Sequence, residues 1–189
     1  MPPRILCAGI LVQKGRKMKI IQRPNEGEFA PHTKPYIALV PDGPIVAYLQ
    51  GKLKTTPEFI LAIPPDKLNF RWAEGEWTIK EILVHIIDSE RIFCYRALRF
   101  ARNDATELTM VDQDLYVLNS GANERKIEEI LEEYTAVRQA SLTFFNSLEE
   151  IALTRAGMVN GNQVSVRALA WLTAGHEIHH LKSIQENYL

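Results

Sequence analysis

The stretch AGHEIHHLKSI, residues 174–184, places three histidines within five positions. His176, Glu177 and His180 spell the H-E-x-x-H pattern, in which two imidazoles one helical turn apart bind zinc and the glutamate acts as a general base. In metalloproteases with this pattern the third ligand lies downstream. Here only LKSIQENYL follows His180, and Glu186 would lie on the same helix about 120° away from it. The pattern therefore does not predict a protease.

A ferritin-like di-iron site does not match either. Such sites need two Glu-x-x-His motifs and two further glutamates, and residues 177–180 supply the single motif in the sequence. A third ligand for His176 and His180 must come from upstream, where the remaining histidines are His32 and His85. His32 lies in a proline-rich segment that does not fix its direction, whereas His85 lies in a predicted helix.

The two C-terminal histidines are predicted to face the protein interior. Each residue turns a helix by about 100°, so that His176 and His180 lie at about −20° and +20° from Leu169, inside an apolar stripe. Buried imidazoles need partners, which leaves two interpretations: a metal site or a hydrogen-bonded histidine cluster. With His85, three ligands would leave a coordination position open, as in catalytic zinc sites. Cys94, roughly 13 Å beyond His85 along the helix, is too far away to close it.

Helical spacing and start signals predict four long helices. Thr78 and Glu81 form a T-x-x-E capping box, and Asn123 and Ser165 are predicted to cap two other helices. The predicted helices cover about residues 45–63 and 79–101, and include residues 127–145 and 169–184. With no convincing alternating strands, this pattern predicts an all-α protein, a four-helix bundle. The long connection at 102–123 is predicted to cross an end of the bundle or to shape a pocket mouth, and NGN at 160–162 is a turn signal.

The N-terminal part is predicted to lie outside the bundle. Five prolines between residues 22 and 44 predict an extended segment. We therefore divide the chain into an N-terminal arm, residues 1–40, extended or partly disordered, and a bundle, residues 41–189. Residues 1–17 are interpreted as an arm or as the product of an upstream start before Met18.

Composition narrows the possible partners. The 189-residue chain has a net charge of −1, so neither nucleic acid nor an anionic membrane is predicted as a partner. No segment reaches the roughly 20 apolar residues of a membrane span. Cys7 and Cys94 lie far apart, which indicates free thiols, a reducing compartment and a cytoplasmic location.

The segments WTIKEILVHIIDSER and RALAWLTAGHEIHHLKSI resemble the DinB-like (YfiT-like) superfamily of metal-dependent enzymes. The resemblance covers about residues 40–189. It implies a four-helix bundle with up-down-down-up topology and a divalent ion, zinc or nickel, bound by His85, His176 and His180. It also implies a homodimer, and for some relatives a reaction with a low-molecular-weight thiol.

The leading functional hypothesis is metal-dependent transfer of a low-molecular-weight thiol to an electrophilic small molecule. Hydrolysis by a metal-activated water is its nearest variant. The alternative is a non-catalytic bundle that binds a metal or another ligand. An enzyme predicts a pocket and an exchangeable position beside the ion, whereas a structural ion predicts a closed shell.

Several charged residues have alternative roles. Glu177, at about +80° on the helix, is a candidate catalytic base or acceptor for a ligand imidazole, or else a solvated charge. Asp88 is predicted either to orient His85 or to pair with Arg91 or Arg96. Glu90 lies on an apolar stripe and is predicted to pair with an arginine of a neighbouring helix. Four polar residues of the long connection are candidates for the pocket lining: Asp112, Gln113, Asp114 and Asn119.

Overall fold

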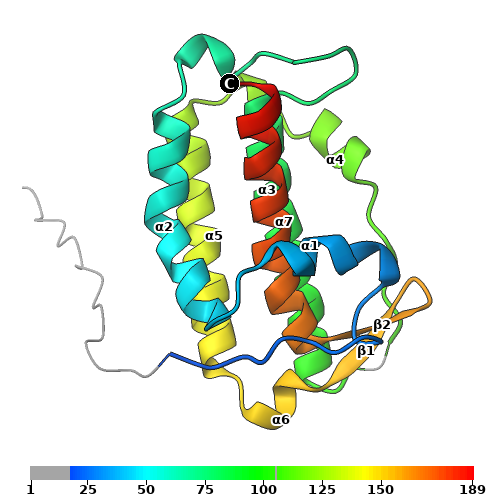
Figure 1. Cartoon of the computed structure of the whole chain (residues 1–189). Helices are drawn as coiled ribbons and strands as arrows, with labels where there is room; N and C mark the ends of the chain where they lie inside the picture. Colours follow the sequence, from blue (N-terminus) through cyan, green and yellow to red (C-terminus); the bar gives the residue numbers. More distant parts are fainter. Residues whose placement is uncertain (1–17, 105) are drawn as a thin grey trace, which may run out of the picture.

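The computed structural model describes residues 18–104 and 106–189 (Figure 1). The predictions for residues 1–17, including Cys7, lie outside this part of the chain. The elements are η1 (Pro31–Thr33), α1 (Lys34–Leu39), α2 (Ile45–Leu61), η2 (Pro65–Lys67), α3 (Ile79–Ala101), α4 (Gln113–Leu118), η3 (Ala122–Glu124), α5 (Ile127–Ser147), α6 (Glu150–Leu153), β1 (Ala156–Val159), β2 (Asn162–Ser165) and α7 (Val166–Asn187). Within the described residues, every helix is too short or too polar to span a lipid bilayer.

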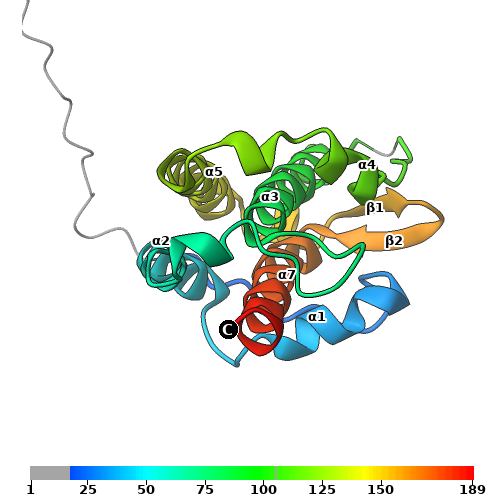
Figure 2. The ribbon, with the colours of Figure 1, turned by 90° about the horizontal axis from the view of Figure 1, so that it is seen from above.

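The long helices α2, α3, α5 and α7 form a four-helix bundle, which confirms the predicted fold class. Figure 1 shows α2 running upward, α3 and α5 downward, and α7 upward. Helix α3 packs against α5 and α7, and α2 packs against the same two helices from the other side (Figure 2). Because α3 and α5 run in the same direction, the connection between them must return along the whole bundle. That connection contains α4.

Of the three helix caps predicted from the sequence, two are confirmed. The capping box of Thr78 and Glu81 opens α3, and the Ser165 hydroxyl accepts a hydrogen bond from the Ala168 N–H at the start of α7. The prediction that Asn123 caps the third helix is wrong, because the N-cap of α5 is Lys126. The Asn123 side chain instead binds Thr78 and Glu81, which fixes the connection to the start of α3.

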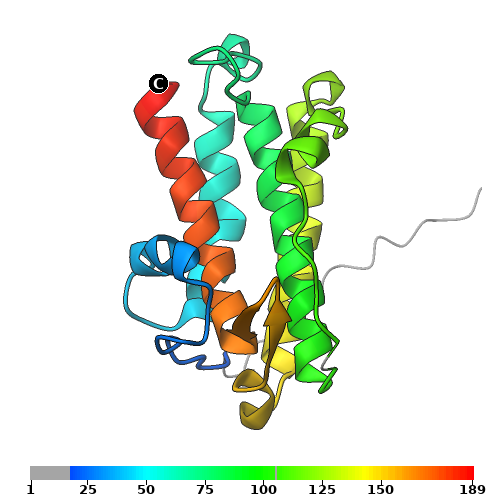
Figure 3. The ribbon, with the colours of Figure 1, turned by 90° about the vertical axis from the view of Figure 1, so that its right-hand side faces the viewer.

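The prediction that residues 22–44 are extended is wrong over Pro31–Leu39, which form η1 and α1. Prolines occupy the first turn of both helices, where their missing N–H costs no hydrogen bond. Helix α1 lies across α7 (Figure 3). A Cβ atom at Gly175 would lie 2.1 Å from the carbonyl oxygen of Tyr36, so that only glycine permits this approach.

A two-stranded sheet was not predicted. Strands β1 and β2 pair antiparallel, with Val159 opposite Asn162. Asn160 and Gly161 form the turn with φ angles of 47° and 73°, as a tight hairpin turn requires. The turn signal was therefore correct, and the four-residue strands beside it were missed. The hairpin lies beside α3 and α7, on the side of the bundle away from α2 (Figure 2).

The core has a polar middle layer. One apolar cluster includes Phe100, Phe145 and Leu169, and a second includes Ile79, Ile130 and Ile184. Around the level where they meet, buried positions of α3, α5 and α7 carry charged side chains and imidazoles: His85, Glu90, Arg138, His176 and Glu177. Buried polar groups at this depth require partners, and the candidate site lies in this layer.

Candidate metal centre

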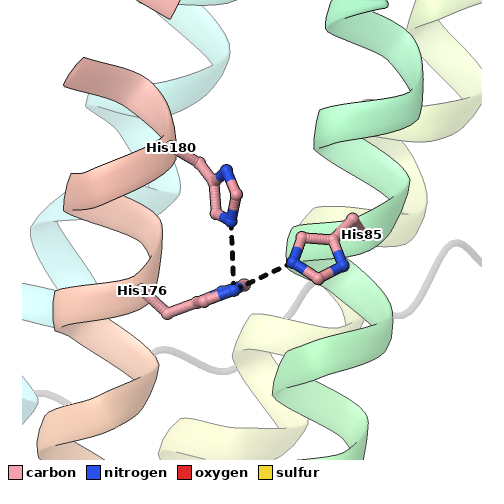
Figure 4. Close-up of side chains that lie close together, drawn as sticks. All are labelled: His85, His176 and His180. Atoms are coloured by element: carbon pink, nitrogen blue, oxygen red, sulfur yellow. Dashed lines mark hydrogen bonds between the residues drawn. The ribbon is translucent and has the colours of Figure 1, made fainter. Parts of the chain in front are cut away.

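Three imidazole rings meet between α3 and α7 (Figure 4). Nε2 of His176 lies 2.9 Å from Nε2 of His85 and 3.1 Å from Nε2 of His180. One nitrogen from each ring lies within 4.8 Å of the other two. The structure thus brings together the three histidines selected from the sequence. In the described part of the chain, no other group of three or more His, Cys, Asp or Glu residues has ligand atoms that converge in this way.

Aromatic side chains hold the rings in place. The Trp77 ring lies 4.7 Å from that of His85, centroid to centroid, and Tyr36 and Phe93 each lie 5.8 Å from His176 with their rings nearly perpendicular. The two edge-to-face contacts on His176 favour a defined ring orientation, and the Trp77 ring packs against His85 at a tilt of 53°. Sequence analysis missed all three roles. The signal for Trp77 was its place just before the N-cap of α3, eight residues before His85, whereas Tyr36 was concealed by the prediction of an extended arm.

The histidines are held in the neutral form. Burial lowers the pKa of His85 to about 4 and that of His180 to about 3, with a further lowering from neighbouring histidines. Burial also holds the pKa of His176 well below its usual range. A neutral imidazole has one free lone pair, which is the form that binds a metal ion.

The donor set fits a divalent ion better than a hydrogen-bonded cluster. Nε2 of His176 faces two other Nε2 atoms, but one ring nitrogen either donates one hydrogen bond or accepts one. A shared cation would engage all three nitrogens at once. Two nitrogens bound tetrahedrally to one zinc ion lie about 3.3 Å apart, close to the two separations found here. Three nitrogens and no thiolate correspond to an open site.

Other candidate ligands lie elsewhere. Glu186, the downstream carboxylate of the protease interpretation, lies 3.6 Å from Lys182 on the surface. Cys94 donates to Ser141 across 3.1 Å, and burial raises the pKa of its thiol to about 12. Cys94 is therefore neither a ligand nor a nucleophile at neutral pH. His32 lies in the cavity wall without joining the triad.

A cavity of about 420 Å³ adjoins the triad. His85 and His176 both line it, so positions left open on an ion would face this space. Its apolar lining includes Ile92, Phe93 and Leu169. Further walls come from η1 and α1, from the β1–β2 hairpin and from the connection around α4, which confirms that this connection shapes a pocket. Their lining residues include Thr33, Tyr36, Met110, Val111, Gln113, Tyr116, Val117, Val159, Asn160, Asn162 and Val164. Of the four polar residues proposed from that connection, Gln113 alone contributes to the lining.

Glu177 does not have the position predicted for it. Its side chain is 0% exposed, so the alternative of a solvated charge is wrong. Its Oε1 accepts hydrogen bonds of 2.7 Å from both Thr56 and Tyr134, and its Oε2 lies 3.0 Å from Nη2 of Arg138. The carboxylate is thus held by α2 and α5, outside the cavity lining and the triad. This placement argues against a role as catalytic base or as acceptor for a ligand imidazole.

Glu90 is paired as predicted. Arg138 is fully buried and donates to both carboxylate oxygens of Glu90 at 2.9–3.1 Å. Burial alone would lower the pKa of Arg138, but Glu177 and Glu90 outweigh burial and hold it well above its usual value. Glu90, Arg138 and Glu177, with Thr56 and Tyr134, form a buried cluster that we call the ion cluster. Among the described residues, Oε2 of Glu177 lies 3.0 Å from Arg138 but makes no hydrogen bond.

Asp88 is paired with Arg91, 3.2 Å away, rather than with His85 or Arg96. It nevertheless lines the cavity, where it is the sole carboxylate among the described lining residues. Burial raises its pKa, and Arg91 opposes that shift. Asp88 is therefore the acidic group placed to exchange protons with a molecule in the cavity.

Comparison with known proteins decides the family. The profile of the DinB superfamily matches residues 49–184. The chain belongs to the DinB superfamily. No curated protein sequence matches this DinB-superfamily chain.

Two solved structures share the fold. YfiT from Bacillus subtilis, described as a probable metal-dependent hydrolase with an unusual four-helix bundle topology, is 15% identical, with a TM-score of 0.66 over 87% of this chain and 90% of YfiT. A DinB-like protein from Bacillus subtilis, YjoA, is 20% identical, with a TM-score of 0.54 over 76% of this chain and 87% of YjoA. At these identities the likeness shows the fold, which agrees with the family implied by the sequence resemblance.

Proposed function

We propose that this protein is a metal-dependent hydrolase whose divalent ion, zinc or nickel, is bound by His85, His176 and His180. The observation that carries the proposal is the convergence of three neutral imidazole nitrogens at the wall of a cavity. The description of the similar YfiT structure as a probable metal-dependent hydrolase supports the reaction class.

The ion would supply Lewis-acid chemistry, polarising a carbonyl and lowering the pKa of a coordinated nucleophile. The protein supplies the rest. The aromatic contacts of Trp77, Tyr36 and Phe93 hold the ligand rings, and apolar side chains such as Ile92 and Leu169 form part of the surface against which a substrate would pack. Asp88, the sole carboxylate among the described lining residues, would accept the proton of the nucleophile at a carboxylate oxygen, and burial raises its pKa, which makes it a stronger base than an exposed aspartate.

Transfer of a low-molecular-weight thiol is the second candidate, supported by the family resemblance. It would use the same triad, with the thiol in place of water. The thiol would come from a cosubstrate, because burial keeps Cys94 protonated. The homodimer and the cytoplasmic location also remain predictions.

The first experiment measures metal content in purified protein. Wild type is expected to bind one divalent ion per chain, and His85→Ala, His176→Ala and His180→Ala are expected to lose it. His179→Ala is the matched control, because His179 is exposed on the same helix and outside the triad. Full metal content in all three triad variants would refute the proposed site.

The second experiment separates a catalytic ion from a structural one. Zinc-loaded and chelator-treated protein are assayed with p-nitrophenyl esters, and with chlorodinitrobenzene plus glutathione or cysteine. Ester cleavage that needs zinc and the triad supports hydrolysis, and thiol-dependent turnover supports transfer. Unfolding on chelation with no turnover in either assay would indicate the non-catalytic alternative.

A further inference from the structure

Arg96 is a buried arginine that faces the cavity. It is 8% exposed and belongs to the cavity lining, where it is the sole arginine or lysine among the described residues. Arg96 follows His85 by eleven positions on α3, which places it roughly 16 Å further along the axis and about 20° around it. The two side chains therefore share one face of the helix, at opposite ends of the cavity.

Within the described residues, Arg96 has no acidic partner. Its one hydrogen bond runs from Nη2 to the carbonyl oxygen of Thr109, at 3.0 Å. A guanidinium carries five N–H donors, so most of them are left for the cavity. Burial lowers the pKa of Arg96, and in the part of the chain that the structure describes no charge opposes this shift. Arg138 differs, since it faces two carboxylates at the same depth.

A buried cation without a counter-charge is costly. Such a cost is tolerated where a ligand supplies the missing charge, and guanidinium groups bind carboxylates through two parallel hydrogen bonds. Between His85 and Arg96, α3 presents four residues to the cavity: Asp88, Ser89, Ile92 and Phe93. The two polar residues are the ones nearer His85, and the part of α3 next to Arg96 is apolar.

We propose that the cavity binds an elongated small molecule with a carboxylate at one end, which pairs with Arg96, and its reacting group at the histidine triad. The position of the reacting group rests on the proposed function, whereas the carboxylate site does not. A single guanidinium matches a monoanion. A phosphate dianion would keep one negative charge unpaired, because Arg96 is the sole arginine or lysine among the described lining residues.

The test uses octanoate as a probe, with octanamide and octylphosphonate as comparisons. Binding to the full-length, chelator-treated protein is measured by isothermal titration calorimetry, so that no metal contributes. Octanoate is expected to bind roughly 10- to 100-fold more tightly than octanamide, because a charge-assisted pair is lost with the amide. Equal affinity for the two would overturn the proposal, and tighter binding of octylphosphonate would overturn the carboxylate assignment.

Variants assign the effect to one residue. Arg96→Gln is expected to weaken octanoate binding by the same roughly 10- to 100-fold factor, and Arg96→Lys to weaken it less. Arg102→Gln is the control, since Arg102 is exposed near the end of the same helix and should bind octanoate as wild type does. Circular dichroism verifies folding. If Arg96→Gln folds and retains wild-type affinity, the proposal is wrong.

A two-headed probe joins the carboxylate site to the triad. Suberic acid monohydroxamate carries a carboxylate at one end and a zinc-binding hydroxamate at the other. It should bind more tightly to zinc-loaded than to chelator-treated protein, and His176→Ala should remove that gain. The carboxylate site and the metal site can therefore be judged separately. If Arg96→Gln loses the preference for octanoate over octanamide but contains as much zinc as wild type, the carboxylate site is supported whatever the outcome of the metal experiments.

Discussion

His176 and Glu177 are neighbours on α7, yet their side chains enter two polar clusters with opposite properties. The ion cluster is held together by bonds among its own members, because Glu90 and Glu177 both face Arg138 and the hydroxyls of Thr56 and Tyr134 donate to Oε1 of Glu177. Among the described residues, Oε2 of Glu177 lies beside Arg138 without a hydrogen bond. The histidine triad is not held together in this way, because Nε2 of His176 faces two further ring nitrogens with a single bonding position. The ion cluster lies away from the cavity, whereas the triad forms part of its wall.

The difference separates structure from function within one layer of the core. A buried polar cluster whose members bond to one another contributes to the fold without a ligand. A cluster with unmatched bonding capacity beside a cavity needs an ion or a substrate. Arg96 belongs to the second kind, since its charge is not matched by the described residues.

Arg138→Met should produce the largest loss of stability. The substitution leaves Glu90 and Glu177 buried without a counter-charge, and breaking a buried pair in this way costs about 3–5 kcal/mol. Urea unfolding at neutral pH measures the change, with the exposed Arg102→Met as the control. A loss below about 1 kcal/mol would show that the ion cluster is not the structural element described above.

The triad should affect stability through the metal. At a free zinc concentration about 100 times the dissociation constant, wild type should gain about 2.7 kcal/mol in unfolding free energy. His176→Ala should gain far less, because only two ligands remain. Unfolding curves with and without zinc give both values. An equal gain in the two proteins would place the zinc site elsewhere.

Glu177→Gln should distinguish the two clusters most directly. The amide can still accept hydrogen bonds from Thr56 and Tyr134, but the ion pair with Arg138 is lost, at a cost of about 1–3 kcal/mol. Zinc content and turnover per folded molecule should not change. Wild-type stability with abolished turnover would instead restore Glu177 as a catalytic base.

A partly exposed ion pair should matter least. Arg167 and Ser165 bind Glu28, and the Arg167 hydrogen bond lowers the pKa of Glu28 from 4.5 to about 2 despite the opposing effect of burial. This stabilisation is present above pH 4.5 and is lost as the pH falls towards 2, with a magnitude of about 1 kcal/mol or less after solvent screening. Glu28→Gln should flatten that part of the acid unfolding curve. An unchanged curve would show that the pair contributes nothing.

Local signals predicted the parts of the fold that local interactions determine. Thr78 and Ser165 marked helix starts through hydrogen bonds within one turn, and the period of the apolar residues placed His176 and His180 inward. Glu177 was misjudged because α7 is buried on more than one side, by α1 and α2 as well as α3. The position of one apolar stripe does not reveal burial on several sides. Where α1 approaches α7, the residues of α7 are small, such as Gly175, and do not form a second stripe of large apolar side chains.

The match to the DinB superfamily begins at residue 49, downstream of α1. A fragment trimmed to that boundary would retain all three histidines but not the part of the cavity wall formed by Ala30, Thr33 and Tyr36. Because Gly175 lets α1 pack directly on α7, the residue at which an expressed fragment begins determines whether this part of the cavity wall is present. Chimeras that exchange residues 18–44 between DinB-superfamily members would alter which molecules fit beside the ion while leaving its ligands in place.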